Sequence, residues 1–257
     1  MKVVILCGGK GTRISEVSSS IPKPMLEIGG KPILWHIMKI YAHYGYRDFV
    51  LALGYGAGYI KDYFLKQKHY DSDFVFNTKD GNLNILNDDL DDFNISFVNT
   101  GLDTPHGERV LKLKDTYIDD TFMVTYGDGI ADINLEDLIK FHKEKGVIAT
   151  ITGAHPSSRW GLVNFDNETG LIKEFAQKPL VGDYINGGFM ICNKEFFNFL
   201  QEGDMIEDAF PKLIAQKQLA LYRHEGFWYG MDTPKDYHTL NELWDEGDPK
   251  WKVWEKK

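Results

Sequence analysis

Cysteine, long apolar runs and net positive charge are all scarce in this sequence, and each shortage excludes a class of protein. Only Cys7 and Cys192 are present, both beside apolar neighbours, so we expect buried free thiols in a reducing cytoplasm rather than a disulfide. No apolar run approaches about 18 residues and Lys2 leads directly into a short apolar run, so neither a membrane span nor a signal peptide is expected. The net charge of −9 argues against general binding to nucleic acid or to an anionic membrane. A polyanionic substrate would therefore have to meet a local cluster of cations.

What the chain does contain suits one large α/β domain. Its 257 residues are 43% hydrophobic, which is enough for a sizeable core. Short continuous apolar runs alternate with segments of helical spacing, a pattern typical of parallel strands covered by helices. The expected strands lie at 2–6, 49–53, 95–98, 122–126 and 147–152, and the expected helices at 32–44, 134–145, 206–216 and 235–244. We therefore predict an α/β fold with a Rossmann-like, mixed, mainly parallel central sheet flanked by helices.

Two stretches break this alternation and predict β-hairpins. The runs 74–76 and 84–86 flank Asp80-Gly81, a good hairpin turn, and form a small β insertion at about 70–95. The runs 161–165 and 171–175 flank a polar segment that ends in Gly170. The second half of the chain is thus expected to be rich in β-structure.

A glycine-rich loop follows the first strand, and the rest of the chain is organised around it. Gly8, Gly9 and Gly11 allow a sharp turn and close approach to a ligand, and their N–H groups can hold phosphate oxygens. Lys10 and Arg13 add positive charge, which makes the loop denser in glycine and cations than a plain surface turn. The loop fits neither G-x-x-x-x-G-K-[ST] nor the dinucleotide fingerprint G-x-G-x-x-G. It predicts a phosphate site of another kind.

Two lysines lie beside prolines. Pro22 and Pro24 restrict the backbone around Lys23 and hold it on a stiff extended segment, and Lys178 precedes Pro179. A rigid backbone suits a lysine that binds a phosphate. For Lys23 the alternative is a solvated surface side chain. The local sequence thus adds two candidate cations to the glycine loop.

Two aspartates follow predicted strands. Asp128 lies between Gly127 and Gly129 at the carboxyl end of the run 122–126, which is where open α/β sheets bind ligands. Asp232 lies between a short strand and the last helix. Carboxylates are the protein ligands that Mg²⁺ prefers, because the ion keeps water and phosphate oxygens as its other partners. The two side chains could share one metal ion, while a turn for Asp128 and a helix cap for Asp232 are the alternatives.

Two weaker signals concern a second loop and a glycine-containing strand. The loop 100–109 is interpreted as facing a ligand, with Gly107 allowing backbone approach and Arg109 supplying charge, and a plain turn is the alternative. Asn186 precedes two glycines, where it could bind sugar hydroxyls or form a turn. Both segments are candidates for ligand contact.

Other conspicuous side chains are assigned to packing. His36 lies within an expected helix and is predicted to be packed rather than to bind a ligand. Trp244, Trp251 and Trp254 crowd the end of the sequence, and we expect them to pack on another subunit.

The collected polar groups suit a reaction that joins two phosphorylated molecules. An oxygen of a sugar 1-phosphate would attack the α-phosphorus of a nucleoside triphosphate, and pyrophosphate would leave. The phosphate monoester needs no general base, because its second pKa of about 6 leaves it mostly dianionic. Catalysis then consists of positioning and charge neutralisation, with Mg²⁺ on the two aspartates.

The loop 8–13 resembles the G-G-x-G-T-R signature of the sugar-phosphate nucleotidyltransferases, which is followed by a Lys-Pro pair as in Pro22-Lys23-Pro24-Met25. Further similar runs are found at 31–38, 126–129, 185–189, 226–228, 231–233, 243–244 and 251–252. Through them nearly the whole chain resembles the glucose-1-phosphate cytidylyltransferase family. The resemblance implies one nucleotidyltransferase domain over 1–257, with a nucleotide-binding part at about 1–130 and a sugar-binding part with C-terminal helices at about 131–257. It also implies CTP and glucose 1-phosphate as substrates, CDP-glucose for dideoxysugars as the product, Mg²⁺ as the cofactor and a homo-oligomer.

The resemblance also implies roles for individual residues. Nucleotide binding falls to Leu6, Gly8, Gly9, Gly11, Thr12, Arg13, Lys23, Thr104, Gly107, Arg109 and Asp128. Sugar-phosphate binding falls to Gln177, Lys178, Asn186 and Gly187, and metal binding to Asp128 and Asp232. Arg13, Lys23, Asp128 and Lys178 are the implied catalytic residues.

Two departures from the family leave alternatives open. Gln177 stands where the family has Glu, which leaves other sugar 1-phosphates or phosphorylated acceptors possible. The segment 106–109 reads His-Gly-Glu-Arg where the family has Thr-Gly-Gly-Arg, which leaves UTP or dTTP possible. A catalytically silent nucleotide-sugar sensor is a rival from another class, and a dinucleotide-dependent oxidoreductase is weaker because its fingerprint fails.

Overall fold

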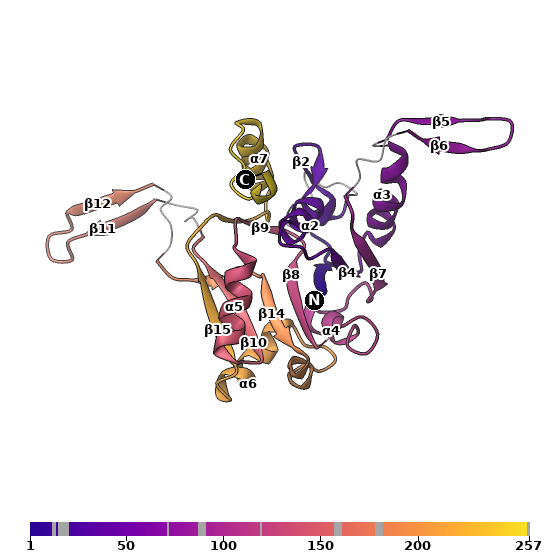
Figure 1. Ribbon diagram of the computed structural model, residues 1–257. Coiled ribbons are helices and arrows are strands. Elements are labelled where there is room, and N and C mark those ends of the chain that lie inside the picture. Colours follow the sequence, from indigo (N-terminus) through magenta and orange to yellow (C-terminus); the bar gives the residue numbers. More distant parts are fainter. Residues whose placement is uncertain are drawn as a thin grey trace.

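The computed structural model describes residues 1–11, 14, 21–70, 72–86, 91–118, 120–156, 161–177 and 182–255, with the side chains of 67–70 excepted (Figure 1). Thr12, Arg13 and Lys178, three of the predicted site residues, lie outside this described part. Strands form a central layer, and helices lie against it.

Within the described residues the central sheet has eight strands in the order β13-β10-β14-β8-β1-β4-β7, with β15 paired to β10. Its strands are β1 Val3–Cys7, β4 Asp48–Leu53, β7 Asn94–Asn99, β8 Thr121–Tyr126, β10 Ala149–Ala154, β13 Ile185–Asn186, β14 Met190–Asn193 and β15 Leu219–His224. The strands β8, β1, β4 and β7 run parallel, as do β10 and β15, whereas β14 is antiparallel to both β8 and β10. The predicted mixed, mainly parallel sheet is confirmed.

Alternate side chains of β1 enter two different cores, which explains its uninterrupted apolar run. Val3 and Ile5 face the core that contains helix α2 (Ile33–His43), whereas Val4 and Leu6 face the core that contains Val110 of helix α4 (His106–Leu111). A strand covered on both faces has no solvent side on which to place polar residues. The helices are α2 Ile33–His43, α3 Ala57–Tyr70, α4 His106–Leu111, α5 Leu135–Lys145, α6 Phe210–Ala215 and α7 Pro234–Asp245.

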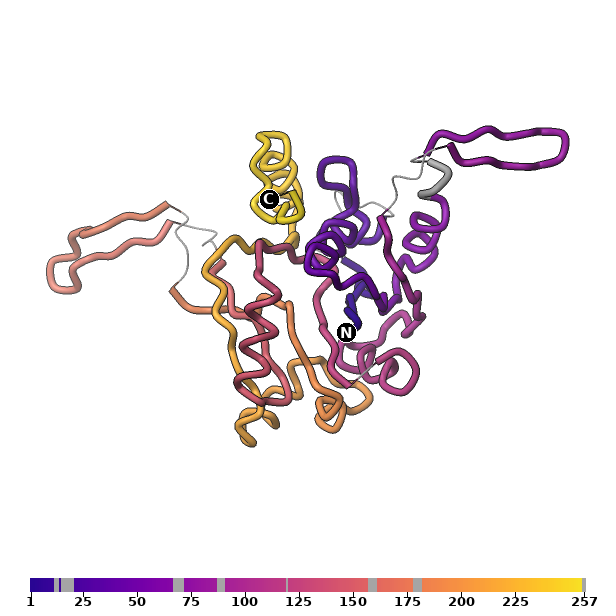
Figure 2. Tube along the Cα trace, in the orientation of Figure 1, coloured from indigo at the N-terminus to yellow at the C-terminus, as the bar shows by residue number. Residues whose placement is uncertain are grey.

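Two hairpins project from the body of the molecule on opposite sides (Figures 1 and 2). One pairs β5 Phe74–Phe76 with β6 Leu83–Ile85, and the other pairs β11 Leu162–Phe165 with β12 Ile172–Ala176. Both confirm the sequence prediction, and their turns use Gly81 and Gly170 at positive φ. Nearly all of their large apolar side chains are exposed.

Short elements connect and cover the sheet. They are η2 Lys23–Met25, β2 Glu27–Ile28, β3 Lys31–Pro32, β9 Gly129–Ala131, η3 Lys194–Phe199, η4 Ile206–Ala209, β16 Trp228–Gly230 and η5 Val253–Glu255. The segment predicted as one helix at 206–216 is η4 followed by α6. No helix among the described ranges combines the length and apolar character needed to cross a membrane.

The tail tryptophans pack on their own chain, so the prediction that they contact another subunit is wrong for the fully buried Trp251 and stays a prediction for the half-buried Trp244 and Trp254. Trp251 is 0% exposed, and its indole N–H donates to Nδ1 of His36 at 3.3 Å. Trp244 and Trp254 also have their rings within about 6 Å of the His36 ring. The apolar groups near the end of the sequence close the core of α2, with His36 at the centre of the cluster.

The buried His36 gives the fold a dependence on pH. Burial lowers the pKa of His36 to about 4, while its Nε2 donates to the carbonyl of Ile28 at 2.8 Å. The unfolded value is about 6.5, so the unfolded chain binds the extra proton in the window between these values. The stability that neutral His36 supplies is therefore complete above pH ~6.5 and is lost as the pH falls towards about 4.

We expect the protonation of His36 to make the free energy of unfolding about 2 kcal/mol lower at pH ~5 than at pH ~7.5. Urea unfolding of the wild type and of His36→Gln at the two pH values measures the effect. The pH-dependent loss of unfolding free energy should be smaller in the variant by about this amount. Equal pH dependence in both proteins would show that His36 does not titrate as described.

Candidate active site

A cleft lies at the carboxyl ends of the parallel strands, where the sequence places its ligand-binding groups. Its lining consists of Leu6, Cys7, Gly9, Gly11, Lys23, Pro24, His106, Tyr126, Gly127, Asp128 and Asp232. The side chains come from the end of β1, from the turn η2, from the start of α4 and from the ends of β8 and β16. Of the predicted site residues, Leu6, Gly9, Gly11, Lys23, Asp128 and Asp232 are brought together here.

The two aspartates meet because the short strands next to them in the sequence pair with each other. Asp128 precedes β9 and Asp232 follows β16, and these strands pair with Gly129 opposite Gly230. The N–H of Met231 also donates to the carbonyl of Asp128 at 2.9 Å. Thr233 rather than Asp232 caps helix α7, since its side chain accepts from the N–H of Asp236. The carboxylate of Asp232 therefore has no capping role.

Lys23 joins the two carboxylates. Its Nζ lies 2.6 Å from Oδ2 of Asp128 and 2.8 Å from Oδ1 of Asp232, and the side chain is only 11% exposed. Burial alone would lower the pKa of Lys23, but the charge and hydrogen bond of Asp128, with those of Asp232, outweigh it and raise the pKa. One ammonium group thus holds two carboxylates that are far apart in the sequence.

The segment around Lys23 is a 3-10 turn, which corrects the prediction of an extended segment. Pro22 is extended, but Lys23–Met25 forms η2 because the N–H of Met25 donates to the carbonyl of Pro22 at 2.8 Å and that of Leu26 to the carbonyl of Lys23 at 3.1 Å. These two turn hydrogen bonds overcome the preference of a residue before proline for extended backbone. The turn still mounts Lys23 rigidly.

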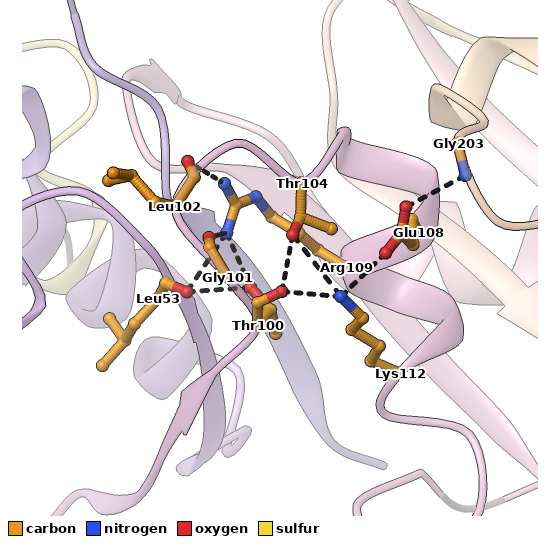
Figure 3. Close-up of polar contacts among 9 residues, drawn as sticks. All are labelled: Leu53, Thr100, Gly101, Leu102, Thr104, Glu108, Arg109, Lys112 and Gly203. Carbon is orange, nitrogen blue, oxygen red and sulfur yellow. Dashed lines mark hydrogen bonds and ion pairs between the residues drawn. The ribbon is translucent and has the colours of Figure 1, made fainter.

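Arg109 does not line the cleft. The sequence predicted a charge facing the ligand, whereas the side chain is buried among backbone carbonyls. The residue is 2% exposed. Its terminal nitrogens donate over 2.7 to 3.2 Å to the carbonyls of Leu53, Gly101 and Leu102 and to the hydroxyl of Thr100 (Figure 3). They also donate to the carbonyl of Gly8 at 3.1 Å. These oxygens belong to three connections at the carboxyl edge of the sheet. The guanidinium therefore ties the glycine loop to two neighbouring loops.

The structure explains the glycine at position 8 by contact with Arg109, whereas the sequence suggested close approach of a ligand. A Cβ at this position would lie 2.2 Å from Cζ of Arg109, and one at Gly54 would lie 2.7 Å from Nη1 of Arg109. Close approach of the guanidinium excludes a side chain at both positions. The glycines of this loop that line the cleft are Gly9 and Gly11, the latter at φ +60°.

The loop 100–109 is partly helical, because α4 begins at His106. Gly107 is buried, and a Cβ there would lie 2.6 Å from the carbonyl oxygen of Met205, so its role in the structure is helix packing. The hydroxyl of Thr104 donates to the carbonyl of Thr100 at 2.7 Å and supports the loop. Neither Gly107 nor Thr104 is among the residues that line the cleft.

Asn186 does not line the cleft, but hydrogen bonds connect it to the cleft residue Tyr126. Its Nδ2 donates to the hydroxyl of Tyr126 at 3.4 Å, and that hydroxyl donates to Glu207 at 2.5 Å. The carbonyl of Gly187 accepts from the indole N–H of Trp228 at 2.8 Å. Gln177 is exposed at the end of the hairpin strand β12.

Five cleft residues were not singled out from the sequence as ligand contacts: Cys7, Pro24, His106, Tyr126 and Gly127. Four of them are sequence neighbours of predicted site residues. That adjacency is the signal that could have identified them. Burial lowers the pKa of His106, while burial and the Glu207 carboxylate raise that of Tyr126. Both side chains are therefore uncharged near neutral pH and can offer hydrogen bonds to a bound molecule.

The donor set fits a divalent cation that keeps other ligands. Within the described residues no group of three or more His, Cys, Asp or Glu side chains could enclose a metal ion. Two carboxylates converge on one point, and that point already holds a cation. Mg²⁺ is commonly bound by one or two carboxylates together with water and phosphate oxygens. The arrangement can therefore hold Mg²⁺ when a phosphorylated ligand supplies the remaining oxygens.

Known proteins resemble the chain over nearly its whole length. The model of the nucleotidyl transferase family matches residues 2–246. A probable glucose-1-phosphate cytidylyltransferase of Bacillus subtilis is 45% identical over 99% of this chain and 100% of its own. The glucose-1-phosphate cytidylyltransferase of Salmonella typhi is 39% identical over the same shares. The UTP-bound UGPase of Acinetobacter baumannii shares the fold, with a TM-score of 0.69 at 18% identity over 100% of this chain and 99% of its own.

Proposed function

Since the chain belongs to the nucleotidyl transferase family, we propose that it joins CTP to α-D-glucose 1-phosphate and releases CDP-glucose and pyrophosphate. The convergence of Asp128 and Asp232 on one cation, beside the glycine loop, is the observation that carries the reaction class. The full-length relatives named glucose-1-phosphate cytidylyltransferase support the choice of nucleotide and sugar.

In this proposal the residues of the chain position phosphates and neutralise charge. The N–H groups of Gly9 and Gly11 face the triphosphate, and Lys23 pairs with one of its oxygens. An oxygen of glucose 1-phosphate attacks the α-phosphorus in line, and the bond to pyrophosphate breaks. Asp128 and Asp232 would hold Mg²⁺, which when bound stabilises the charge that develops on the phosphate oxygens. Arg13 and Lys178 supply further positive charge.

The remaining assignments extend this proposal along the chain. Nucleotide contacts come from Leu6, Gly9, Gly11, Thr12, Arg13, Lys23 and Asp128, and sugar-phosphate contacts from Gln177, Lys178, Asn186 and Gly187. Residues 1–257 act as one nucleotidyltransferase domain, with the nucleotide part at about 1–130 and the sugar part at about 131–257.

The two buried free cysteines support a cytoplasmic location.

A different sugar 1-phosphate, or UTP or dTTP in place of CTP, is the second candidate. His106 favours it because this side chain lines the cleft and replaces the Thr of the family pattern. Gln177 favours it because an amide replaces the carboxylate of that pattern. A silent sensor is disfavoured by Asp128, Asp232 and Lys23, which are all present and grouped.

A matrix of four nucleoside triphosphates against several sugar 1-phosphates, read as pyrophosphate release, tests the proposal. CTP with glucose 1-phosphate should give the highest kcat/KM, by at least about tenfold over the next pair. Faster release with another pair would identify the second candidate. No release with any pair in Mg²⁺ would contradict nucleotidyl transfer and leave the sensor.

We also propose that the chain is a homo-oligomer. An isolated two-stranded hairpin is marginally stable in water. The hairpins β5–β6 and β11–β12 nevertheless expose residues such as Phe76, Phe165 and Ile172 to 51% or more. A second copy of this chain would cover these side chains, and a light-scattering mass equal to one chain would contradict this.

A further inference from the structure

We propose that Lys23 is a resident counterion that holds Asp128 and Asp232 in place in the metal-free protein and leaves them when the nucleotide arrives with its metal ion. The inference rests on the proposed function, because it assigns the same two carboxylates to Mg²⁺. It adds that the free protein has weak affinity for the metal and that metal and triphosphate bind together.

The geometry of the three side chains carries the inference. The Lys23 Nζ bonds to one oxygen of each aspartate, at 2.6 and 2.8 Å, so it occupies the point on which both carboxylates converge. Mg²⁺ binds carboxylate oxygens at about 2.1 Å and requires nearly octahedral geometry. A divalent ion between the same two oxygens would lie against the ammonium group, and the two like charges would repel at contact distance. The metal and the ammonium therefore exclude each other from this point.

Two carboxylates that converge without a cation would repel each other in a partly buried cleft. Their side chains are 36% and 35% exposed, whereas that of Lys23 is 11% exposed. The lysine thus supplies, from within the chain, the positive charge that keeps the aspartates at one point. Lys23 is in this respect a positioning residue for the metal ligands.

The glycine loop offers Lys23 its second position. A Cβ built on Gly11 would lie 3.0 Å from Cβ of Lys23, so the lysine stem runs directly beside the loop. Oxygens of a triphosphate held by Gly9 and Gly11 would lie within reach of Nζ after rotation of the side chain alone. The ammonium can then pass from carboxylate to phosphate while the accompanying metal takes its place. A cation remains at the aspartates throughout this exchange.

Mn²⁺ binding in the absence of nucleotide, measured from the electron paramagnetic resonance signal of the free ion, tests the inference. Lys23→Met and the polar variant Lys23→Gln should each bind Mn²⁺ at least about tenfold more tightly than the wild type, because the competing charge is gone. Lys39→Met is the matched control: Lys39 is also partly buried and pairs with Asp91 at 2.5 Å, away from the cleft. Its Mn²⁺ affinity should equal that of the wild type. The gain should disappear in the double variant Lys23→Met/Asp128→Asn.

Two results would overturn the inference. One is Mn²⁺ affinity in both Lys23 variants no higher than in the wild type, and the other is a gain that persists when Asp128 is also replaced. Should Lys23→Met fail to fold by circular dichroism, Lys23→Gln decides alone. The wild type's pyrophosphate release separates this inference from the proposed function. Tighter Mn²⁺ binding without any release contradicts the function, whereas release without tighter binding contradicts only the role of Lys23.

Discussion

Asp128→Asn is expected to lower kcat by at least about a hundredfold while the protein remains folded. The amide has nearly the same shape as the carboxylate but carries no charge for a metal ion. The Asp128 side chain is 36% exposed, so the substitution leaves no deeply buried polar group without a partner. Steady-state pyrophosphate release in saturating Mg²⁺, with thermal unfolding as the check on folding, measures both effects.

Asp91→Asn is the matched control for that substitution. Asp91 is also a partly buried aspartate paired with a lysine, at 2.5 Å from Lys39, but it lies outside the cleft. Its kcat should stay within about twofold of the wild type, as for a surface change away from the chemistry. Near wild-type turnover of Asp128→Asn in Mg²⁺ would show that this carboxylate does not bind the metal.

Arg109→Met is expected to lower the free energy of unfolding by about 3–5 kcal/mol, because several buried oxygen acceptors lose hydrogen bonds from a charged donor. Methionine fills much of the space but leaves the carbonyls of Gly8, Leu53 and Gly101 without the donor that joins them. The glycine loop then loses its tie to two neighbouring loops. We therefore also expect KM for the nucleotide to rise in the folded variant. Urea unfolding and initial-rate kinetics measure the two quantities.

Arg47→Met provides the comparison, because Arg47 is exposed and donates to the carbonyl of Asp92 at 3.4 Å. It should change the unfolding free energy by no more than about 0.5 kcal/mol. An Arg109→Met protein as stable as Arg47→Met, but with lost nucleotide binding, would mean that Arg109 contacts the ligand. That outcome would restore the role predicted from the sequence.

The strands and hairpins could be predicted because their signals are local. The run 3–7 is apolar without interruption since both faces of β1 are covered, and Asp80-Gly81 has the composition of a hairpin turn. The meeting of Asp128 and Asp232 was also within reach, because the ends of strands share one edge of a sheet. What the sequence did not reveal is the pairing of β9 with β16, which aligns the two residues.

Local sequence patterns were not sufficient where one pattern is compatible with two long-range arrangements. Glycines beside an arginine suit a phosphate loop, but they also suit an arginine buried against backbone carbonyls, as for Gly8 and Arg109. Tryptophans near the end of a sequence can cover another subunit or their own helix, and Trp251 covers His36. Spacing along the chain does not distinguish these outcomes, because the deciding partners lie about a hundred residues or more away in sequence.

The central claim is that Asp128, Asp232 and Lys23 meet around one metal-bound triphosphate. Anomalous diffraction from a crystal grown with Mn²⁺ and a non-hydrolysable CTP analogue tests it most directly. The account predicts one Mn²⁺ peak bonded to oxygens of both aspartates, with Nζ of Lys23 moved onto a phosphate oxygen. A nucleotide bound in the cleft with its Mn²⁺ away from Asp232, and with Lys23 still between the two carboxylates, would contradict it.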